Sequence, residues 1–159
     1  MLLRAILLGW GLCVASVAFG QAAPARVSGQ SLYLPVYSHI LHGEGGGKAQ
    51  SARVLVSVMV SIRNTDTLRP MRVTSAVYYD TEGRRIKDYV PAPRVVAPMG
   101  TLEIFIPRSD DTGGSGANFV IGWKADAPVN PPLVEAVHAN FPTGRSIVFI
   151  TSARPIQTE

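Results

Sequence analysis

The feature that most constrains the fold of this chain is a strict alternation of side chains over residues 52–64. Valine or isoleucine occupies every second position, at Val54, Val56, Val58, Val60 and Ile62. The intervening positions hold Leu55, Ser57, Met59, Ser61 and Arg63. A period of two belongs to a β-strand, whereas a helix would scatter the valines around its circumference, and β-branched residues are poor helix formers. We therefore expect a central strand over residues 52–64.

Shorter alternating segments follow along the chain, each bounded by Pro, Gly, Asn or Asp. They predict strands over residues 31–38, 71–80, 101–107, 118–125, 133–141 and 146–152, and a hairpin over residues 78–89. The hairpin prediction rests on a tight-turn sequence that Asp80 opens and Gly83 closes. No helical periodicity is sustained anywhere in the chain. The pattern predicts an all-β, antiparallel two-sheet sandwich of about 7–8 strands, with a closed barrel as the alternative.

The first residues have the pattern of a secretory signal peptide. Arg4 precedes an uncharged apolar run, and the small residues Ala18 and Gly20 stand where a signal peptidase reads the chain. Cleavage after Gly20 is the first expectation, with Ala22 and Ala23 as alternatives. A run of about 15 apolar residues is shorter than the roughly 20 that a membrane-spanning helix needs. We expect residues 1–20 to be a signal peptide, 21–30 a disordered leader and 31–159 a single β-sandwich domain, periplasmic or secreted.

Composition narrows the chemistry of the mature chain. The one cysteine, Cys13, lies inside the apolar run and follows bulky residues, which argues against a lipoprotein cleavage site. Its removal would leave neither a disulfide nor a thiol nucleophile. Without Arg4, 14 basic residues face 11 acidic ones, a net charge of +3. The basic residues are scattered, so we expect no nucleic-acid partner, and the mature chain has no expected membrane span.

Two resemblances concern the whole domain. The stretch from Val56 to Pro107 loosely resembles small immunoglobulin-like modules of exported proteins. More specifically, residues 32–150 are similar to an uncharacterised family of exported bacterial proteins, domain of unknown function 3124. The segments that carry this similarity are residues 34–40 (LPVYSHI) with His42 and Gly43, residues 61–66 (SIRNTD), residues 78–81 (YYDT) and residues 113–119 (GGSGANF). The resemblance implies export, an immunoglobulin-like sandwich by the looser likeness, and no assigned activity.

The most unusual segment of the mature chain is the glycine-rich stretch over residues 109–118. Its glycines would let backbone N–H groups converge on an anion, while acidic and amide side chains would suit a calcium ion. The spacing fits neither a P-loop nor an EF-hand. The candidate contact residues are Asp110, Asp111, Ser115 and Asn118. The alternative is a long structural turn between two strands.

Histidines provide the second candidate site. His39 and His42 stand three residues apart, so in an extended segment they point to opposite faces and could share a metal only if the chain turns between them. Glu44 or the distant His138 would supply a further ligand. The alternative is that these histidines are surface or hydrogen-bonded side chains.

Catalytic patterns are weak. Ser115 lacks the spacing of a nucleophile elbow, and hydrolysis through Ser115, His39 and Asp110 is not favoured. The leading hypothesis is a non-enzymatic binding or structural module of the cell envelope, which contacts an unknown protein or small ligand through its glycine-rich loops. The rival is a metal-binding protein or metal-dependent enzyme that uses His39, His42 and a carboxylate. The sequence identifies no cofactor.

Overall fold

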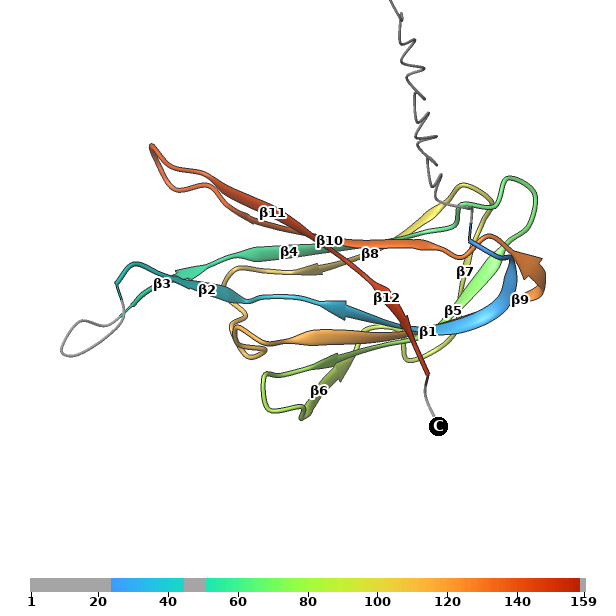
Figure 1. Ribbon diagram of the computed structural model, residues 1–159, viewed down its shortest axis with the longest axis horizontal. Coiled ribbons are helices and arrows are strands. Elements are labelled where there is room, and N and C mark those ends of the chain that lie inside the picture. Colours follow the sequence, from blue (N-terminus) through green and yellow to red (C-terminus); the bar gives the residue numbers. More distant parts are fainter. Residues whose placement is uncertain (1–23, 45–50, 158–159) are drawn as a thin grey trace, which may run out of the picture.

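A computed structural model describes residues 24–44 and 51–157 of the chain. These residues form two β-sheets that lie face to face, together with a two-stranded ribbon at one end (Figure 1). All pairings between the strands are antiparallel. The all-β two-sheet prediction is therefore confirmed. The predicted signal peptide and residues 45–50 of the first glycine-rich loop lie outside the described residues.

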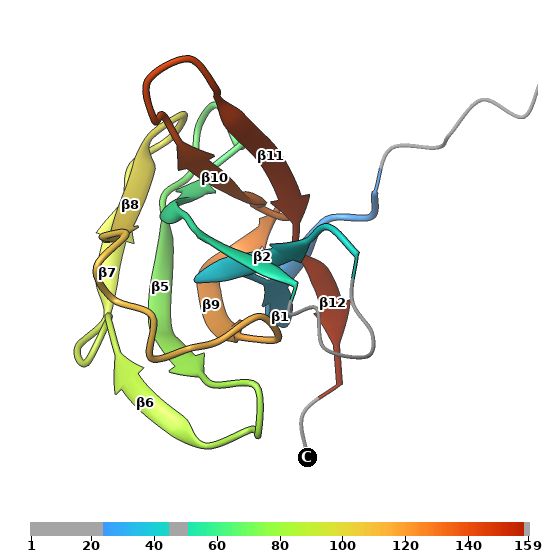
Figure 2. The same ribbon diagram turned by 90° about the vertical axis from the view of Figure 1, so that its left-hand side faces the viewer.

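The larger sheet has six strands and is built around β9. Its strand order is β12-β1-β9-β5-β6. β6 pairs with the end of β5, and β7 pairs with the beginning of β5 on the same edge. The strands are β1 (Val27–Pro35), β5 (Met71–Tyr79), β6 (Arg85–Asp88), β7 (Arg94–Val96), β9 (Asn118–Val129) and β12 (Arg154–Ile156). β-Bulges interrupt β1 between Val27 and Gly29 and β5 between Val73 and Ser75. The end view shows the six-stranded sheet from β6 at one edge to β12 at the other (Figure 2).

The smaller sheet has four strands in the order β11-β10-β4-β8. The strands are β4 (Ser57–Arg63), β8 (Thr101–Ile106), β10 (Leu133–Asn140) and β11 (Ile147–Ser152). The ribbon of β2 (His39–His42) and β3 (Ala52–Leu55) extends from one end of the sandwich, near the hairpin of β10 and β11 (Figure 1). β4 is thus a central strand, as its alternation predicts.

The core lies between the two sheets and follows the predicted alternation. Val58, Val60 and Ile62 of β4 are buried, and they face a second buried row, Phe119, Ile121 and Trp123 of β9. The outward residues of β4 include Met59, which is exposed. Packing of these two rows stabilises the fold, because burial of a large apolar side chain contributes about 1.5–3 kcal/mol.

Two strand boundaries differ from the sequence-based prediction. β1 begins at Val27, inside the stretch expected to form the disordered leader, because Val27 pairs with Val129 at the end of β9. The predicted strand over residues 52–64 is divided at Val56, whose N–H donates to the Ser38 carbonyl at 3.0 Å. The first part therefore pairs with β2, while the second part joins the four-stranded sheet.

The described residues contain twelve strands, more than the predicted 7–8. The additional ones are short: β3, which results from the division at Val56, and β2, β7 and β12 have three or four residues each. Such segments show little alternation of their own and form because a longer neighbour supplies the hydrogen bonds. Among the residues described, no helix has the length and apolarity needed to cross a membrane.

Candidate functional site

The predicted contact loop, which precedes β9, is folded around its own side chains. The Asp110 N–H donates to the Pro107 carbonyl, and the Asp110 carboxylate accepts from the backbone N–H and hydroxyl of Thr112 at 3.2 and 2.6 Å. These contacts are local turn bonds of the kind that Asp commonly makes. Asp110 and Ser115 are half-buried, and Asn118 is the first residue of β9. The loop has a defined conformation.

Backbone groups of this loop bind two other segments of the chain. The Gly113 carbonyl accepts from the N–H and hydroxyl of Thr81 at 3.0 and 3.1 Å, and the Gly116 N–H donates to the Thr81 hydroxyl at 2.9 Å. The Gly114 carbonyl accepts from the N–H and hydroxyl of Ser38, both at 3.0 Å. The loop thereby connects the end of β1 to the turn after β5, and these groups already have partners.

Two of the glycines are required by packing. A Cβ on Gly113 would lie 1.9 Å from the Tyr78 hydroxyl and 2.7 Å from the Ala117 Cβ. Gly114 has a φ of +78°, and a Cβ there would lie 2.4 Å from the Thr81 hydroxyl. Side chains rarely adopt this backbone conformation. The glycine density of the loop therefore reflects the close approach of chain segments.

Asp111 and His39 meet through Arg53 at the base of the β2–β3 ribbon. The Arg53 guanidinium donates to the Asp111 carboxylate at 2.7 Å and lies 3.3 Å from Nδ1 of His39. Burial and then the positive charge of Arg53 lower the pKa of His39, whereas Asp111 acts in the opposite direction. Neutral His39 can therefore accept from Arg53 through Nδ1.

The second predicted histidine does not join this cluster. His42 is exposed at the end of β2, opposite Ala52, three residues from His39 along the strand. Within residues 24–44 and 51–157, no three His, Cys, Asp or Glu side chains are grouped as metal ligands would be. His138, the suggested third ligand, is fully buried, and its Nε2 accepts from the Tyr37 N–H at 3.1 Å. The structure does not bring the three histidines into one arrangement.

A different surface stands out on the outer face of the four-stranded sheet. The strand register places four side chains side by side across it, one from each strand: Phe105 of β8, Met59 of β4, Val137 of β10 and Ile150 of β11. We call these four the apolar row. Phe105 is 61% exposed, Ile150 59% and Met59 39%. Large apolar side chains at adjacent outward positions of every strand form a continuous patch, which is unlike the isolated exposed apolar residues of an ordinary surface.

The apolar row continues toward the end of the sandwich that carries the β2–β3 ribbon. Val148 and Ala139 face each other across β11 and β10 in the next outward position, and Phe141 follows β10. Val148 and Phe141 are exposed. On the other side of the row, Arg63 donates to Glu135 at 2.7 Å, and this polar pair ends the patch. The outer face is thus apolar over one half and charged over the other.

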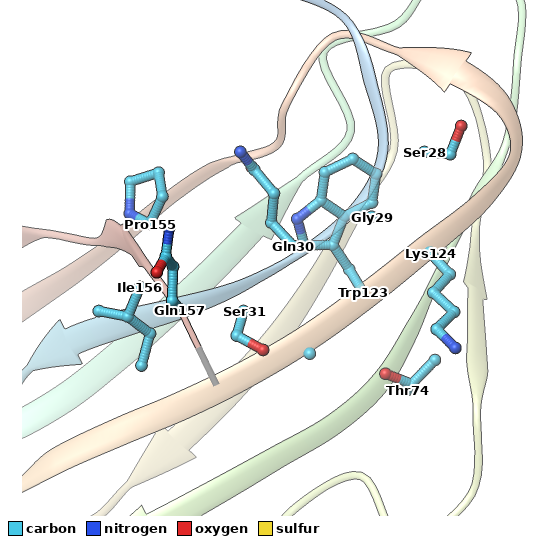
Figure 3. Close-up of a pocket in the computed structure, with 11 residues that line it drawn as sticks. Ser28, Gly29, Gln30, Ser31, Thr74, Trp123, Lys124, Pro155, Ile156 and Gln157 are labelled. Carbon is cyan, nitrogen blue, oxygen red and sulfur yellow. The ribbon is translucent and has the colours of Figure 1, made fainter. Parts of the chain in front are cut away.

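The outer face of the six-stranded sheet holds an open cavity of about 940 Å³. It is an open depression between β12, β1, β9 and β5, and Figure 3 shows Ser31, Thr74 and Lys124 around it. Gly122 lines the cavity. A Cβ at this position would lie 2.8 Å from the Thr74 hydroxyl, so there is little space for a side chain. The depression is lined by both polar and apolar residues, and the described residues around it form no cluster of catalytic groups.

Comparison with known proteins identifies the family. The sequence matches the family model described as protein of unknown function (DUF3124) over residues 29–156. The chain belongs to this family. The family resemblance predicted from the sequence is confirmed, and the DUF3124 match extends over both sheets. No curated protein matches the sequence.

One solved structure that resembles this DUF3124 protein is the crystal structure of Thermotoga maritima 1070. The two share 9% sequence identity with a TM-score of 0.45, over 79% of this chain and 92% of that one. Similarity at this level says nothing about what the DUF3124 protein binds.

The predicted site residues of this DUF3124 protein therefore fall into two groups. Asp111 and His39 come together through Arg53, whereas His42 lies apart from them. Asp110, Ser115 and Asn118 are not arranged around one ligand position, and contact with a ligand or partner through them stays a prediction. The apolar row was missed by the sequence analysis. Its signal was present in the exposed positions of β4, β8 and β11, where Met59, Phe105 and Ile150 stand instead of polar residues.

Proposed function

We propose that this protein is an exported, non-enzymatic binding module of the cell envelope that holds a protein partner against the outer face of its four-stranded sheet. The observation that carries the proposal is the apolar row, in which Phe105, Met59, Val137 and Ile150 lie next to one another and three of the four are exposed. Exposed patches of this kind mark interaction sites in soluble proteins.

The shape of the surface favours a protein partner over a small ligand. Small-molecule sites are concave and enclose most of the ligand. The apolar row lies instead on the exposed side of a sheet, and aromatic residues and Met, such as Phe105 and Met59, are typical of protein interfaces. The charged pair of Arg63 and Glu135 beside the row would belong to a polar rim.

Several of the polar candidate groups already have partners within the chain, which supports a binding module over an enzyme. Asp111 and His39 both contact Arg53, and the carbonyls of Gly113 and Gly114 bind Thr81 and Ser38. Export is inferred from the signal-peptide pattern of residues 1–20. Intact-mass measurement of the protein from the periplasmic fraction tests export. A mature chain starting between Gln21 and Pro24 is the expected result, and an unprocessed chain would contradict it.

Site-specific photocrosslinking in living cells tests the contact face. A photoreactive amino acid at Phe105 should give a discrete crosslinked product in the cell envelope, whereas the same group at Lys124, which is exposed on the opposite sheet, should not. Equal products from the two positions, or none from Phe105, would overturn the proposal.

A further inference from the structure

We infer that the partner of the apolar row is a second copy of this chain, packed sheet against sheet about a two-fold axis parallel to the strands and lying between β4 and β10. This inference rests on the proposed contact face and adds its occupant. A two-fold interface requires one surface to be complementary to itself. The order of the strands and of the residues on them decides whether this face meets that requirement.

The apolar row is complementary to itself under this rotation. The axis exchanges β8 with β11 and β4 with β10. It therefore brings Phe105 of one copy over Ile150 of the other, and Met59 over Val137. Each contact joins a large or flexible side chain to a branched aliphatic one. Such pairs interdigitate between packed sheets, which lie about 10 Å apart.

The neighbouring outward positions are compatible with the same rotation. On the apolar side of the row, Ser57 lies over Ala139 of the second copy. On the charged side, Glu103 of β8 lies over Ser152 of β11, and Glu135 lies over Ser61. No carboxylate of one copy is thus opposed to a carboxylate of the other, although the Ser61 side chain is itself buried. Like charges directly opposed would favour dissociation, and this arrangement avoids them.

The size of the face is that of a dimer interface at the small end of the range. Four strands about 4.8 Å apart, with six residues rising about 3.4 Å each, have a plan area of roughly 400 Å². This is below the roughly 600–800 Å² per partner of a standard interface and in the range of weak, transient contacts. Such an area suits a reversible dimer of chains that are already folded.

Charge-pair variants give the sharpest test, because the proposed axis joins two different residues. Phe105→Glu and Ile150→Lys each bury an unpaired charge against an apolar side chain, and in a homodimer this happens at two contacts. In a mixture of the two variants, the new carboxylate faces the new ammonium group at one contact, and Phe105 faces Ile150 at the other. The heterodimer should therefore form better than either homodimer.

The measurement is sedimentation equilibrium of the exported protein purified from the periplasm. The wild type and the control Lys124→Glu should dimerise, the two single variants should each bind at least about tenfold more weakly, and their mixture should recover most of the affinity. Melting temperatures of all variants verify folding. A wild type that is monomeric at about 200 µM, or a dimer that neither variant weakens, overturns the inference.

The crosslinking experiment separates this inference from the proposed function. A product from position 105 with the mass of two copies of this chain supports both. A product that contains a different protein overturns the self-association inference and leaves the proposed contact face standing. No product from position 105, together with a monomeric protein, overturns both.

Discussion

The two outer faces of the sandwich differ in what they expose at equivalent positions. On the six-stranded sheet, the register places Ser31, Gly122 and Ser75 side by side, and Ser31 and Gly122 line the open depression. On the four-stranded sheet, the corresponding positions hold the apolar row. The inner faces of both sheets are apolar because they form one core. At these positions one outer face presents small residues beside an open depression, and the other presents large apolar side chains.

The largest expected effect is the difference in stability between substitutions on the buried and on the exposed side of β4. Val58→Asp buries an unpaired carboxylate in the core, which costs several kcal/mol against a typical total stability of about 5–15 kcal/mol. We expect the domain to unfold. Met59→Asp, one residue away on the exposed face, should fold with a small change in melting temperature and weaken association. Equal loss of melting temperature in the two variants would contradict the assignment of faces.

The stability of the sandwich should fall as the pH falls through the titration range of His138. This residue is fully buried and stacked on Phe149, with ring centroids 4.4 Å apart. Burial lowers its pKa from 6.5 to about 4, although backbone groups of Phe149 and Ala136 act in the opposite direction. The neutral form is therefore favoured in the folded state, and this contribution to stability is fully present above pH 6.5.

The loss expected from His138 is about 3 kcal/mol between pH 6.5 and pH 4, because protonation favours the unfolded chain. Urea unfolding over this range measures it. His138→Gln should have a lower stability at neutral pH and a shallower dependence on pH, whereas the exposed control His42→Gln should follow the wild type. Parallel pH profiles for the wild type and His138→Gln would show that His138 is not the titrating group.

Gly113→Ala tests whether the loop before β9 is part of the fold. The new methyl group would overlap the Tyr78 ring, and overpacking of this kind costs about 1–3 kcal/mol. Gly83→Ala is the matched control, since Gly83 also lies in a turn but a Cβ there would meet no atom within 4 Å. Its φ of +78° leaves only backbone strain of about 1 kcal/mol. Chemical denaturation compares the two, and a smaller loss for Gly113→Ala than for Gly83→Ala would contradict the tight packing.

The smallest effect should come from the ion pair between Arg53 and Asp111. Both side chains are nearly half exposed, so Asp111→Asn should change stability by less than about 1 kcal/mol. The charge of Asp111 raises the pKa of His39, so its removal should lower that pKa further, and Arg53→Gln should raise it. NMR titration of the imidazole measures both shifts. An unchanged His39 pKa in both variants would mean that the two charged side chains do not act on the imidazole.

The sequence predicts the sandwich because its longest signals are local. The alternation from Val58 to Ile62 and the apolar face of Phe119, Ile121 and Trp123 set which side of β4 and β9 is buried. The division of the predicted strand at Val56 depends on a hydrogen bond to Ser38, which lies earlier in the chain. The alternation of side chains continues across Val56, so the sequence pattern does not reveal the division. Strand β12, with Pro155 at its centre, has no signal apart from its pairing with β1.

The apolar row could be predicted only in part, because it depends on contacts between segments that are distant in the sequence. Each outward apolar residue is visible within its own strand, as Met59 is among the serines of β4. These residues form one patch only because β8, β4, β10 and β11 pair with one another, and these strands are far apart in the sequence. The glycine-rich loop shows the converse case. Its composition suggested a ligand, whereas its glycines are explained by Tyr78 and Thr81, which no local pattern reveals.

Oxidation of two methionines tests the contact face most directly. Met59 is 39% exposed within the apolar row, and Met99 is 67% exposed in the turn before β8, away from the row. Mild peroxide treatment of cells, followed by mass spectrometry, gives the ratio of sulfoxide at the two positions. If the outer face is covered, Met59 is protected relative to Met99 in the wild type, and Phe105→Glu removes the protection. The same ratio in both proteins would contradict a covered outer face.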